Sequence, residues 1–142
     1  MIRGRVLRPR AVAAACGIGI LALAACSGGS TAPPAPGERL YALNCLACHQ
    51  KGGEGVRGMQ PPLAGTPVPV GDPAVLLAWV MFGERPAALP RGQYNGVMPQ
   101  FGYLKDADLA ALLTYVRGSF GNHAPAITPE MVAAARAAHR GG

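Results

Sequence analysis

The chain has 142 residues, half of them hydrophobic and 14% charged, which allows a packed core in a single domain. This apolar content excludes a disordered chain, although 20 glycines and 14 prolines indicate long loops between short helices. The formal net charge is +6, but four of the 13 basic residues lie within the first ten positions, and the remaining nine face seven acidic residues. The resulting net charge of about +2 on the rest of the chain argues against nucleic-acid binding.

Residues 1–25 are predicted to be an export signal. Four arginines precede an apolar run from Ala11 to Ala25, which at about 15 residues is shorter than the ~20 that span a bilayer as a helix. The run ends in "LAAC", which resembles the lipobox of bacterial lipoproteins, with Cys26 as the lipidated residue. Ordinary cleavage at a small-x-small site is the alternative. We therefore expect an exported protein, anchored in the cell envelope by lipid on Cys26 and facing the periplasm or another extracytoplasmic space.

The segment 26–36 is predicted to be a flexible tether, because it is rich in serine, glycine and proline and carries no charge. Residues 37–142 are expected to be all-α, since no stretch alternates apolar and polar residues over enough positions for a sheet. Asp72 with Pro73 is typical of a helix start, and Gly83 of a helix end. Helices are predicted at residues 38–47, 73–82, 106–120 and 128–139.

The stretch "CLACH" contains Cys45, Cys48 and His49 and is the attachment signature for c-type haem. Thiols three residues apart lie on one side of a helical turn and can reach the two vinyl groups of one porphyrin. The adjacent histidine then points at the iron from the same face. With Cys16 inside the signal and Cys26 assigned to lipid, Cys45 and Cys48 are the remaining thiols.

Three other uses of these residues compete with haem attachment. A thioredoxin-like site needs a preceding strand and a βαβ frame, whereas a helix is predicted before Cys45. A structural zinc site needs four ligands, but Cys48 and His49 are adjacent and no second Cys/His cluster follows. A simple disulfide leaves His49 without a role. The motif therefore favours one covalently bound haem c.

The iron needs a second axial ligand or an open position. Met98 lies in the loop "NGVMPQFG", between a nearby glycine and a proline, and such a loop can present a thioether while its backbone stays rigid. We predict Met98 as this ligand. The other candidates are less suitable. Met59 is close to His49 in sequence, and Met81 is expected in the core of its helix. Met131, His123 and His139 lie late in the chain.

Residues 37–121 resemble the small bacterial class I c-type cytochromes, on the strength of "CLACH", "GVMPQF" and the amphipathic helix that follows. The resemblance implies a cytochrome c fold, with three to four helices around one haem and an extra C-terminal helix in residues 122–142. The end of the domain is similar to cytochrome c domains associated with membrane dehydrogenases, oxidases and nitrite reductases. That pattern usually has Ser or Thr before the acidic pair, where this chain has Lys105, so Asp106 is expected to cap the helix.

The resemblance also implies roles for single residues. Pro61 matches the proline whose carbonyl accepts a hydrogen bond from Nδ1 of the iron-binding histidine, and Leu63 matches an aliphatic residue packed on the haem. Trp79 is expected either beside the haem and its propionates or as core filler. Two patterns mark a helix crossing, formed by Gly37 and Tyr41 on the first helix and by Leu112 and Tyr115 on a later one.

The expected function is one-electron transfer in a respiratory or dehydrogenase chain. With His49 and Met98 as axial ligands, no position remains for a substrate or oxygen, so the protein is expected to be a carrier rather than an enzyme. Thioether ligation raises the reduction potential relative to two histidines. The expected partners are redox proteins and the membrane, without a small-molecule substrate or nucleic acid. The alternative is a haem protein with a labile sixth ligand that acts as a gas sensor or peroxidase-like enzyme.

Overall fold

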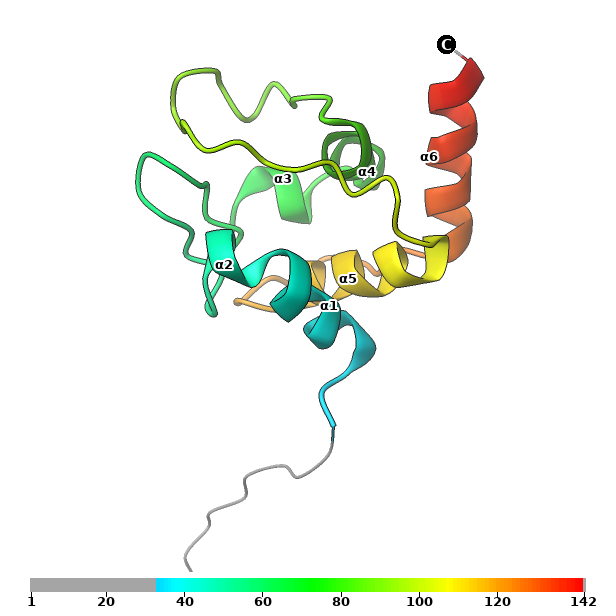
Figure 1. Cartoon of the computed structure of the whole chain (residues 1–142), viewed down its shortest axis with the longest axis horizontal. Coiled ribbons are helices and arrows are strands. Elements are labelled where there is room, and N and C mark those ends of the chain that lie inside the picture. The colour runs from blue at the N-terminus through cyan, green and yellow to red at the C-terminus, as the bar shows by residue number, and fades with distance from the viewer. Residues whose placement is uncertain (1–32, 142) are drawn as a thin grey trace, which may run out of the picture. The chain divides into compact units, whose positions relative to one another are not determined.

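A computed structural model describes residues 33–141 of the chain. The predicted signal, the lipidation site Cys26 and the tether up to residue 32 lie outside the described residues. The described part is all-α, as predicted, and its one β feature is an isolated bridge between Val56 and Gln60. Its helices are α1 (Pro36–Asn44), α2 (Leu46–His49), α3 (Pro67–Val70), α4 (Pro73–Phe82), α5 (Asp106–Gly118) and α6 (Pro129–Gly141) (Figure 1).

Several helix boundaries differ from the prediction. Helix α1 begins at Pro36, inside the predicted tether, because proline suits the first turn of a helix. The predicted first helix is divided at Cys45, whose φ of −121° lies outside the helical range, so α1 and α2 are separate. The short helix α3 was not predicted, because two prolines in four residues mask its signal. Helix α5 ends at Gly118 rather than at Phe120.

The capping signals of α4 and α5 had different outcomes. Asp72 caps α4 as predicted, since its Oδ1 accepts a hydrogen bond of 2.8 Å from a first-turn N–H, and Gly83 ends the helix with a left-handed φ of 75°. The prediction that Asp106 caps α5 is wrong, because Lys105 is the N-cap residue and Asp106 is the first helical residue. The Asp106 carboxylate instead accepts a 2.7 Å hydrogen bond from Nε of Arg136 in α6. A tertiary contact has replaced the local cap.

Helices α1 and α5 cross at very close range, as the two sequence patterns predicted. A Cβ atom placed on Gly37 would lie 2.3 Å from the carbonyl oxygen of Ala111 and 2.8 Å from Cβ of Tyr115. One turn along α1, the Tyr41 ring packs on the Tyr115 ring with their centroids 5.5 Å apart. The Tyr41 hydroxyl donates a 2.5 Å hydrogen bond to the carbonyl of Gln50, just after α2. The crossing therefore fixes the position of the Cys-x-x-Cys-His turn.

The hydrophobic core lies between α1, α4, α5 and α6. Met81 of α4 is 1% exposed, which confirms its assignment to the core, and Leu112 of α5 is also 1% exposed. The C-terminal helix belongs to this core, because Val132 of α6 is fully buried and Ile127 before it is 4% exposed. Residues of the predicted extension therefore contribute to the same core as residues 37–121.

Two buried polar side chains tie the segment 61–71 to the end of α5. Arg117 is 1% exposed, and its guanidinium donates to the carbonyls of Pro125, Pro69 and Gly71 at 2.7, 2.7 and 3.0 Å. Asn122 is 2% exposed; its amide nitrogen donates to the Leu63 carbonyl at 3.1 Å, and its oxygen accepts from a backbone N–H at 2.7 Å. Because buried polar groups are costly when unpaired, these bonds hold the segment firmly.

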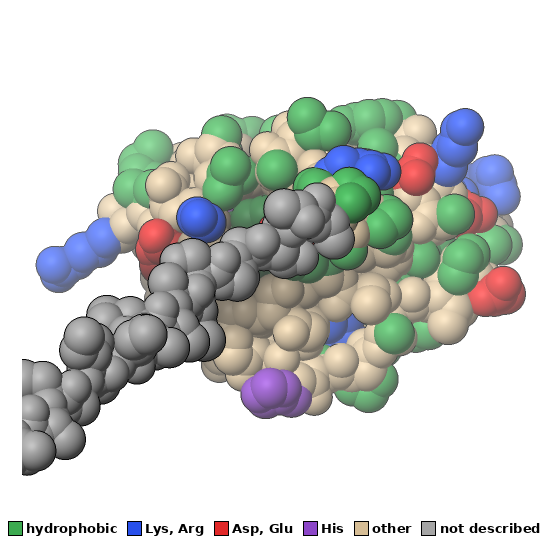
Figure 2. All heavy atoms as spheres, turned by 90° about the horizontal axis from the view of Figure 1, so that it is seen from below, with side chains coloured by type: hydrophobic (Ala, Val, Ile, Leu, Met, Phe, Trp, Pro, Cys, Tyr) green, Lys and Arg blue, Asp and Glu red, His purple; other side chains and the backbone are tan. Residues whose placement is uncertain are grey.

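The charges are dispersed on the face of the molecule that Figure 2 shows. There Lys and Arg side chains alternate with Asp and Glu side chains among apolar and uncharged groups. Large apolar side chains also reach the surface, with Val97 89% and Leu43 81% exposed. None of the helices described for residues 33–141 combines the length and the apolar character required to cross a bilayer.

Candidate cofactor site

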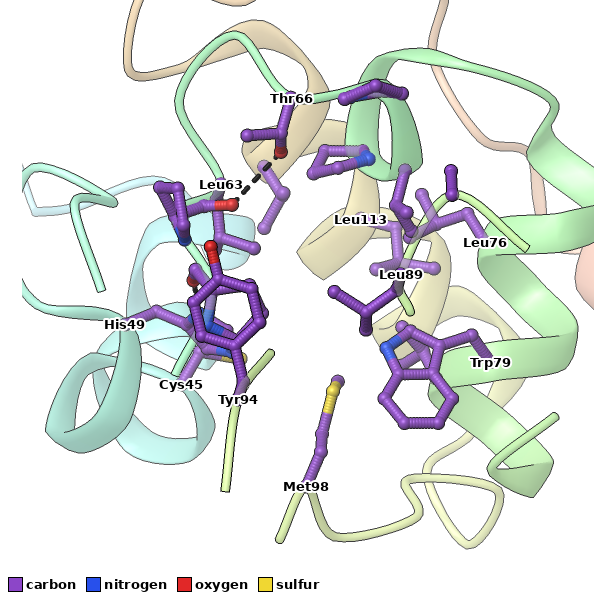
Figure 3. A pocket seen from close by; sticks show the side chains of 18 of the residues that line it. Cys45, His49, Leu63, Thr66, Leu76, Trp79, Leu89, Tyr94, Met98 and Leu113 are labelled. Atoms are coloured by element: carbon purple, nitrogen blue, oxygen red, sulfur yellow. Dashed lines mark hydrogen bonds between the residues drawn. The ribbon is translucent and has the colours of Figure 1, made fainter. Parts of the chain in front are cut away.

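A mostly apolar cavity lies between α2, the segment 61–69, α4, the loop 88–101 and α5 (Figure 3). It holds about 930 Å³ of empty space, part of it open to solvent. All seven predicted haem-site residues line this cavity or the adjoining one at its mouth. They are Cys45, Cys48, His49, Pro61, Leu63, Trp79 and Met98.

The two thiols and the imidazole come from one turn of chain at the junction of α1 and α2. The carbonyl of Cys45 accepts hydrogen bonds from the N–H groups of Cys48 and His49 at 3.1 and 2.8 Å. The two cysteines are half-buried and are not joined by a disulfide. Burial, with a smaller contribution from Cys48, raises the pKa of Cys45 to about 11. Catalytic dithiol sites depend on a lowered thiol pKa, so this environment does not suit a redox-cycling pair.

His49 is held in one orientation by the segment 61–71. It is 6% exposed, and its Nδ1 lies 3.0 Å from the carbonyl oxygen of Pro61, the contact that the resemblance implied. A carbonyl can only accept, so Nδ1 carries the proton and Nε2 keeps its lone pair. Burial lowers the pKa of His49, against a smaller opposing effect of the Pro61 hydrogen bond. Burial thus favours the neutral imidazole and the Pro61 carbonyl orients it, and a neutral, oriented imidazole is the form that binds a metal ion.

Met98 points into the cavity from the loop between α4 and α5, and its sulfur lies toward the interior (Figure 3). On one side of Met98, the Gly96 N–H donates to the Met59 carbonyl at 2.8 Å. On the other side, the Phe101 N–H donates to the Val80 carbonyl at 2.9 Å. The thioether thus enters the same cavity as the His49 ring, from a loop fixed at both of its ends.

The other proposed axial ligands lie elsewhere. Met81 is buried in the core, and Met131 packs against that core from α6. His123 is exposed, and His139 contacts Glu84 through Nδ1 at 3.0 Å. None of these four lines the cavity. Met59 reaches only its mouth and is 44% exposed.

The family model of cytochrome c matches residues 34–119 of the chain. This chain belongs to the cytochrome c family. Its described residues hold no cluster of three or more His, Cys, Asp or Glu suited to a metal ion, and no strand that could frame a thioredoxin-like site. As a member of this family, the protein is an electron carrier with covalently bound haem c, and Cys45 and Cys48 suggest its attachment motif.

The cytochrome is also similar to individual proteins. Cytochrome c-552 of Thermus thermophilus is 35% identical over 100 residues, which are 67% of each chain. The cytochrome c subunit of the quinone alcohol dehydrogenase of Gluconobacter oxydans is 37% identical over 63% of this chain but only 19% of the subunit. The cytochrome c subunit of gluconate 2-dehydrogenase from Pantoea cypripedii is 33% identical over 70% of this chain and 24% of the subunit. The two dehydrogenase subunits thus extend far beyond the matched part.

Arg85 is a site residue that the sequence analysis missed. Its guanidinium carbon lies 5.1 Å from the centroid of the Trp79 ring, and its Nη1 is buried without a hydrogen-bond partner among the described residues. Leaving a charged donor unpaired in this way is costly, so it indicates an acceptor that the protein itself does not supply. The signal for it was local: Gly83 reverses the chain after α4, which brings Arg85 back over Trp79 of the same helix.

The residues present fit a haem. The cavity offers two thiols for covalent attachment, a neutral imidazole, a thioether, apolar walls and, at its mouth, a guanidinium with one buried nitrogen that lacks a hydrogen-bond partner within residues 33–141. The walls include several apolar residues that the sequence analysis did not assign to the site, because their pattern marks them only as core. These are Leu76, Val80, Leu89, Phe101, Leu113 and Val116.

Proposed function

We propose that this cytochrome carries single electrons with His49 and Met98 as axial ligands. The observation that supports this ligation most directly is the Met98 sulfur pointing into the cavity that the His49 ring lines (Figure 3). Once bound, the haem supplies the one-electron couple of its iron. The side chains then have the tasks of holding it, orienting its ligands and keeping water away. With both axial positions occupied by protein, substrate binding at the iron is prevented.

Each residue of the proposed site has a separate task. Cys45 and Cys48 attach the haem covalently, which prevents its loss outside the cytoplasm. The Pro61 carbonyl orients His49 and increases the basicity of its Nε2 through the hydrogen bond at Nδ1. Leu63 packs on the same side of the haem as His49, in a segment that the buried Asn122 anchors. The iron ligands are thus held by side chains and backbone whose own positions are fixed.

Arg85 and Trp79 supply the polar and aromatic edge of the site. We assign the unpaired Arg85 Nη1 to a haem propionate, because a carboxylate is the acceptor that a buried guanidinium binds best. Trp79 packs between Arg85 and the apolar walls, which favours the first of its two predicted roles. A cation in this position favours the ferrous state, since the ferric state carries one more positive charge.

The proposal also covers the partners and the location of the protein in the cell. The similarity to dehydrogenase cytochrome subunits supports exchange of electrons with a respiratory or dehydrogenase chain. We further propose that lipid on Cys26 tethers the domain to a membrane of the cell envelope, on its periplasmic or other extracytoplasmic side. A tether raises the effective concentration of the domain near membrane-bound partners.

The ligation can be tested with the purified wild-type holoprotein. The ferric form is expected to show the weak far-red charge-transfer band of a methionine–iron bond, and the ferrous form is expected to bind carbon monoxide slowly. Rapid binding of carbon monoxide together with a missing band would contradict the carrier and support the alternative, a gas sensor or peroxidase-like enzyme with a labile sixth ligand.

A further inference from the structure

We propose that helix α6 acts as a brace for the methionine loop, residues 83–105, and that Arg136 is the positioning residue that keeps Met98 at the iron. This inference rests on the proposed ligation by Met98. It assigns a role to the C-terminal segment, which lies outside the region matched by the family model. In Figure 1, α6 stands beside α4 and α5, at the side where the methionine loop leaves α4 and enters α5.

The end of the methionine loop is fixed by a single guanidinium. Arg136 donates from Nε to Asp106 Oδ1 at 2.7 Å, from Nη1 to the Gly102 carbonyl and from Nη2 to the Leu104 carbonyl. All three acceptors lie within five residues at the entrance to α5. The Arg136 side chain is 22% exposed, so these charge-assisted bonds are partly shielded from water. Lysine, which lacks the planar fork, cannot reproduce all three bonds.

Helix α6 also contacts the chain where the same loop leaves α4. The rings of His139 and of Phe82, the last residue of α4, stack with their centroids 3.8 Å apart and their planes within 5°. His139 also contacts Glu84 through Nδ1 at 3.0 Å, but both side chains are about half exposed. Exposed ion pairs contribute little to stability, so the contact between His139 and Glu84 is weaker than the bonds of Arg136. Helix α6 therefore holds the loop at both of its ends.

Met98 occupies the part of the loop that depends most on these supports. Among the described residues, no backbone–backbone hydrogen bond holds positions 97–100, which lie between the bonds of Gly96 and Phe101. The Gln100 side chain adds one link, since its amide donates to the Phe82 carbonyl at 2.9 Å. Residues 97–100 thus form a short segment that its two neighbouring segments hold in place. The C-terminal one of these, residues 101–106, is itself attached to α6. Loosening that support gives the thioether room to leave.

Arg136→Ala tests the proposal in the holoprotein. Carbon monoxide can bind ferrous iron only when Met98 has left, so its binding rate reports the population of the open loop. Losing three hydrogen bonds from a charged group is expected to raise this rate at least about tenfold in native buffer. In a denaturant series, the far-red ferric band should disappear at a lower denaturant concentration than the helical circular dichroism signal. In the wild type, the two transitions should lie closer together.

Two further variants make the result specific. Arg140→Ala removes an exposed cation one turn further along α6 and should leave the rate unchanged. Arg136→Lys keeps the charge but loses the fork, and an intermediate rate is expected. This variant decides the question if Arg136→Ala cannot be isolated as a holoprotein.

The failure of this inference is distinguishable from the failure of the proposed ligation. If the wild type shows the far-red band but the Arg136 variants bind carbon monoxide no faster, α6 does not brace the loop. The same conclusion follows if Arg140→Ala has an equal effect, or if the band and the helical signal are lost together in every variant. If the wild type lacks the band, the ligation by Met98 is wrong and the inference falls with it.

Discussion

Replacing Gly37 with alanine tests the physical basis of the α1–α5 crossing. The new Cβ would lie 2.3 Å from the Ala111 carbonyl oxygen, about 1 Å inside ordinary van der Waals contact. A backbone oxygen in the middle of a helix cannot rotate away, and Cβ of Tyr115 at 2.8 Å closes the other direction. The two helices must therefore separate, and the Tyr41–Tyr115 ring contact at 5.5 Å must loosen with them.

The size of the effect is the difference between two terms. Overpacking of a well-packed contact costs about 1–3 kcal/mol. Here the neighbouring atoms are a backbone oxygen and a Cβ atom, which cannot move without moving the helix. Replacing a helical glycine by alanine gains roughly 0.5–1 kcal/mol, and less at Gly37 because it is the second residue of α1. We expect a net loss of about 1–2 kcal/mol in the free energy of unfolding, which for a domain of this size is a fall of roughly 4–15 °C in Tm.

The measurement is denaturant unfolding of the holoprotein, followed by circular dichroism. Gly118→Ala is the matched control, because Gly118 ends α5 and a Cβ there meets nothing within 4 Å. This control should be as stable as the wild type or slightly more stable. If Gly37→Ala also matches or exceeds the wild type, the crossing tolerates a side chain and the reasoning about close approach is refuted.

Three further results are expected. Met98→Ala should remove the far-red ferric band and let the ferrous protein bind carbon monoxide rapidly; a variant that keeps the band would exclude Met98 as the ligand. Arg85→Gln should lower the reduction potential in a redox titration, because it removes a cation that favours ferrous iron. Arg91→Gln, which removes an exposed cation from the same loop, should leave the reduction potential unchanged. Equal potentials in the wild type and both variants would contradict the assignment of Arg85 to a propionate. Cys26→Ala should move the protein from the membrane to the soluble fraction of the cell envelope, whereas a wild type already found in the soluble fraction would contradict lipid anchoring.

Much of the site could be predicted because its determinants are local or carry a rare residue type. The Cys-x-x-Cys-His turn needs only one helical turn to bring Cys45, Cys48 and His49 together. Met98 was distinguishable from the other methionines because it lies in a loop flanked by Gly96 and Pro99. The caps of α4 depend on adjacent residues and were predicted for the same reason.

The errors concern charged side chains whose contacts depend on how neighbouring elements pack. Asp106 has the composition of a helix cap, but its carboxylate is bound by Arg136, thirty residues away. Arg85 looks like an ordinary surface arginine until the chain reversal at Gly83 buries its Nη1. Neither contact leaves a periodic pattern in the sequence, because each depends on the placement of one long polar side chain.

The buried Asn122 limits how far this cytochrome can be truncated from its C-terminus. It follows the last residue matched by the family model by three positions and is the first residue of the segment expected to be an extension. Its amide nevertheless donates to the Leu63 carbonyl at 3.1 Å, in the segment whose Pro61 carbonyl orients His49. A fragment ending at residue 121 would retain every residue proposed to bind the haem or its iron, and would still lose a support of the segment that orients His49. The shortest fragment that keeps the haem site fully supported is therefore longer than the sequence motifs suggest.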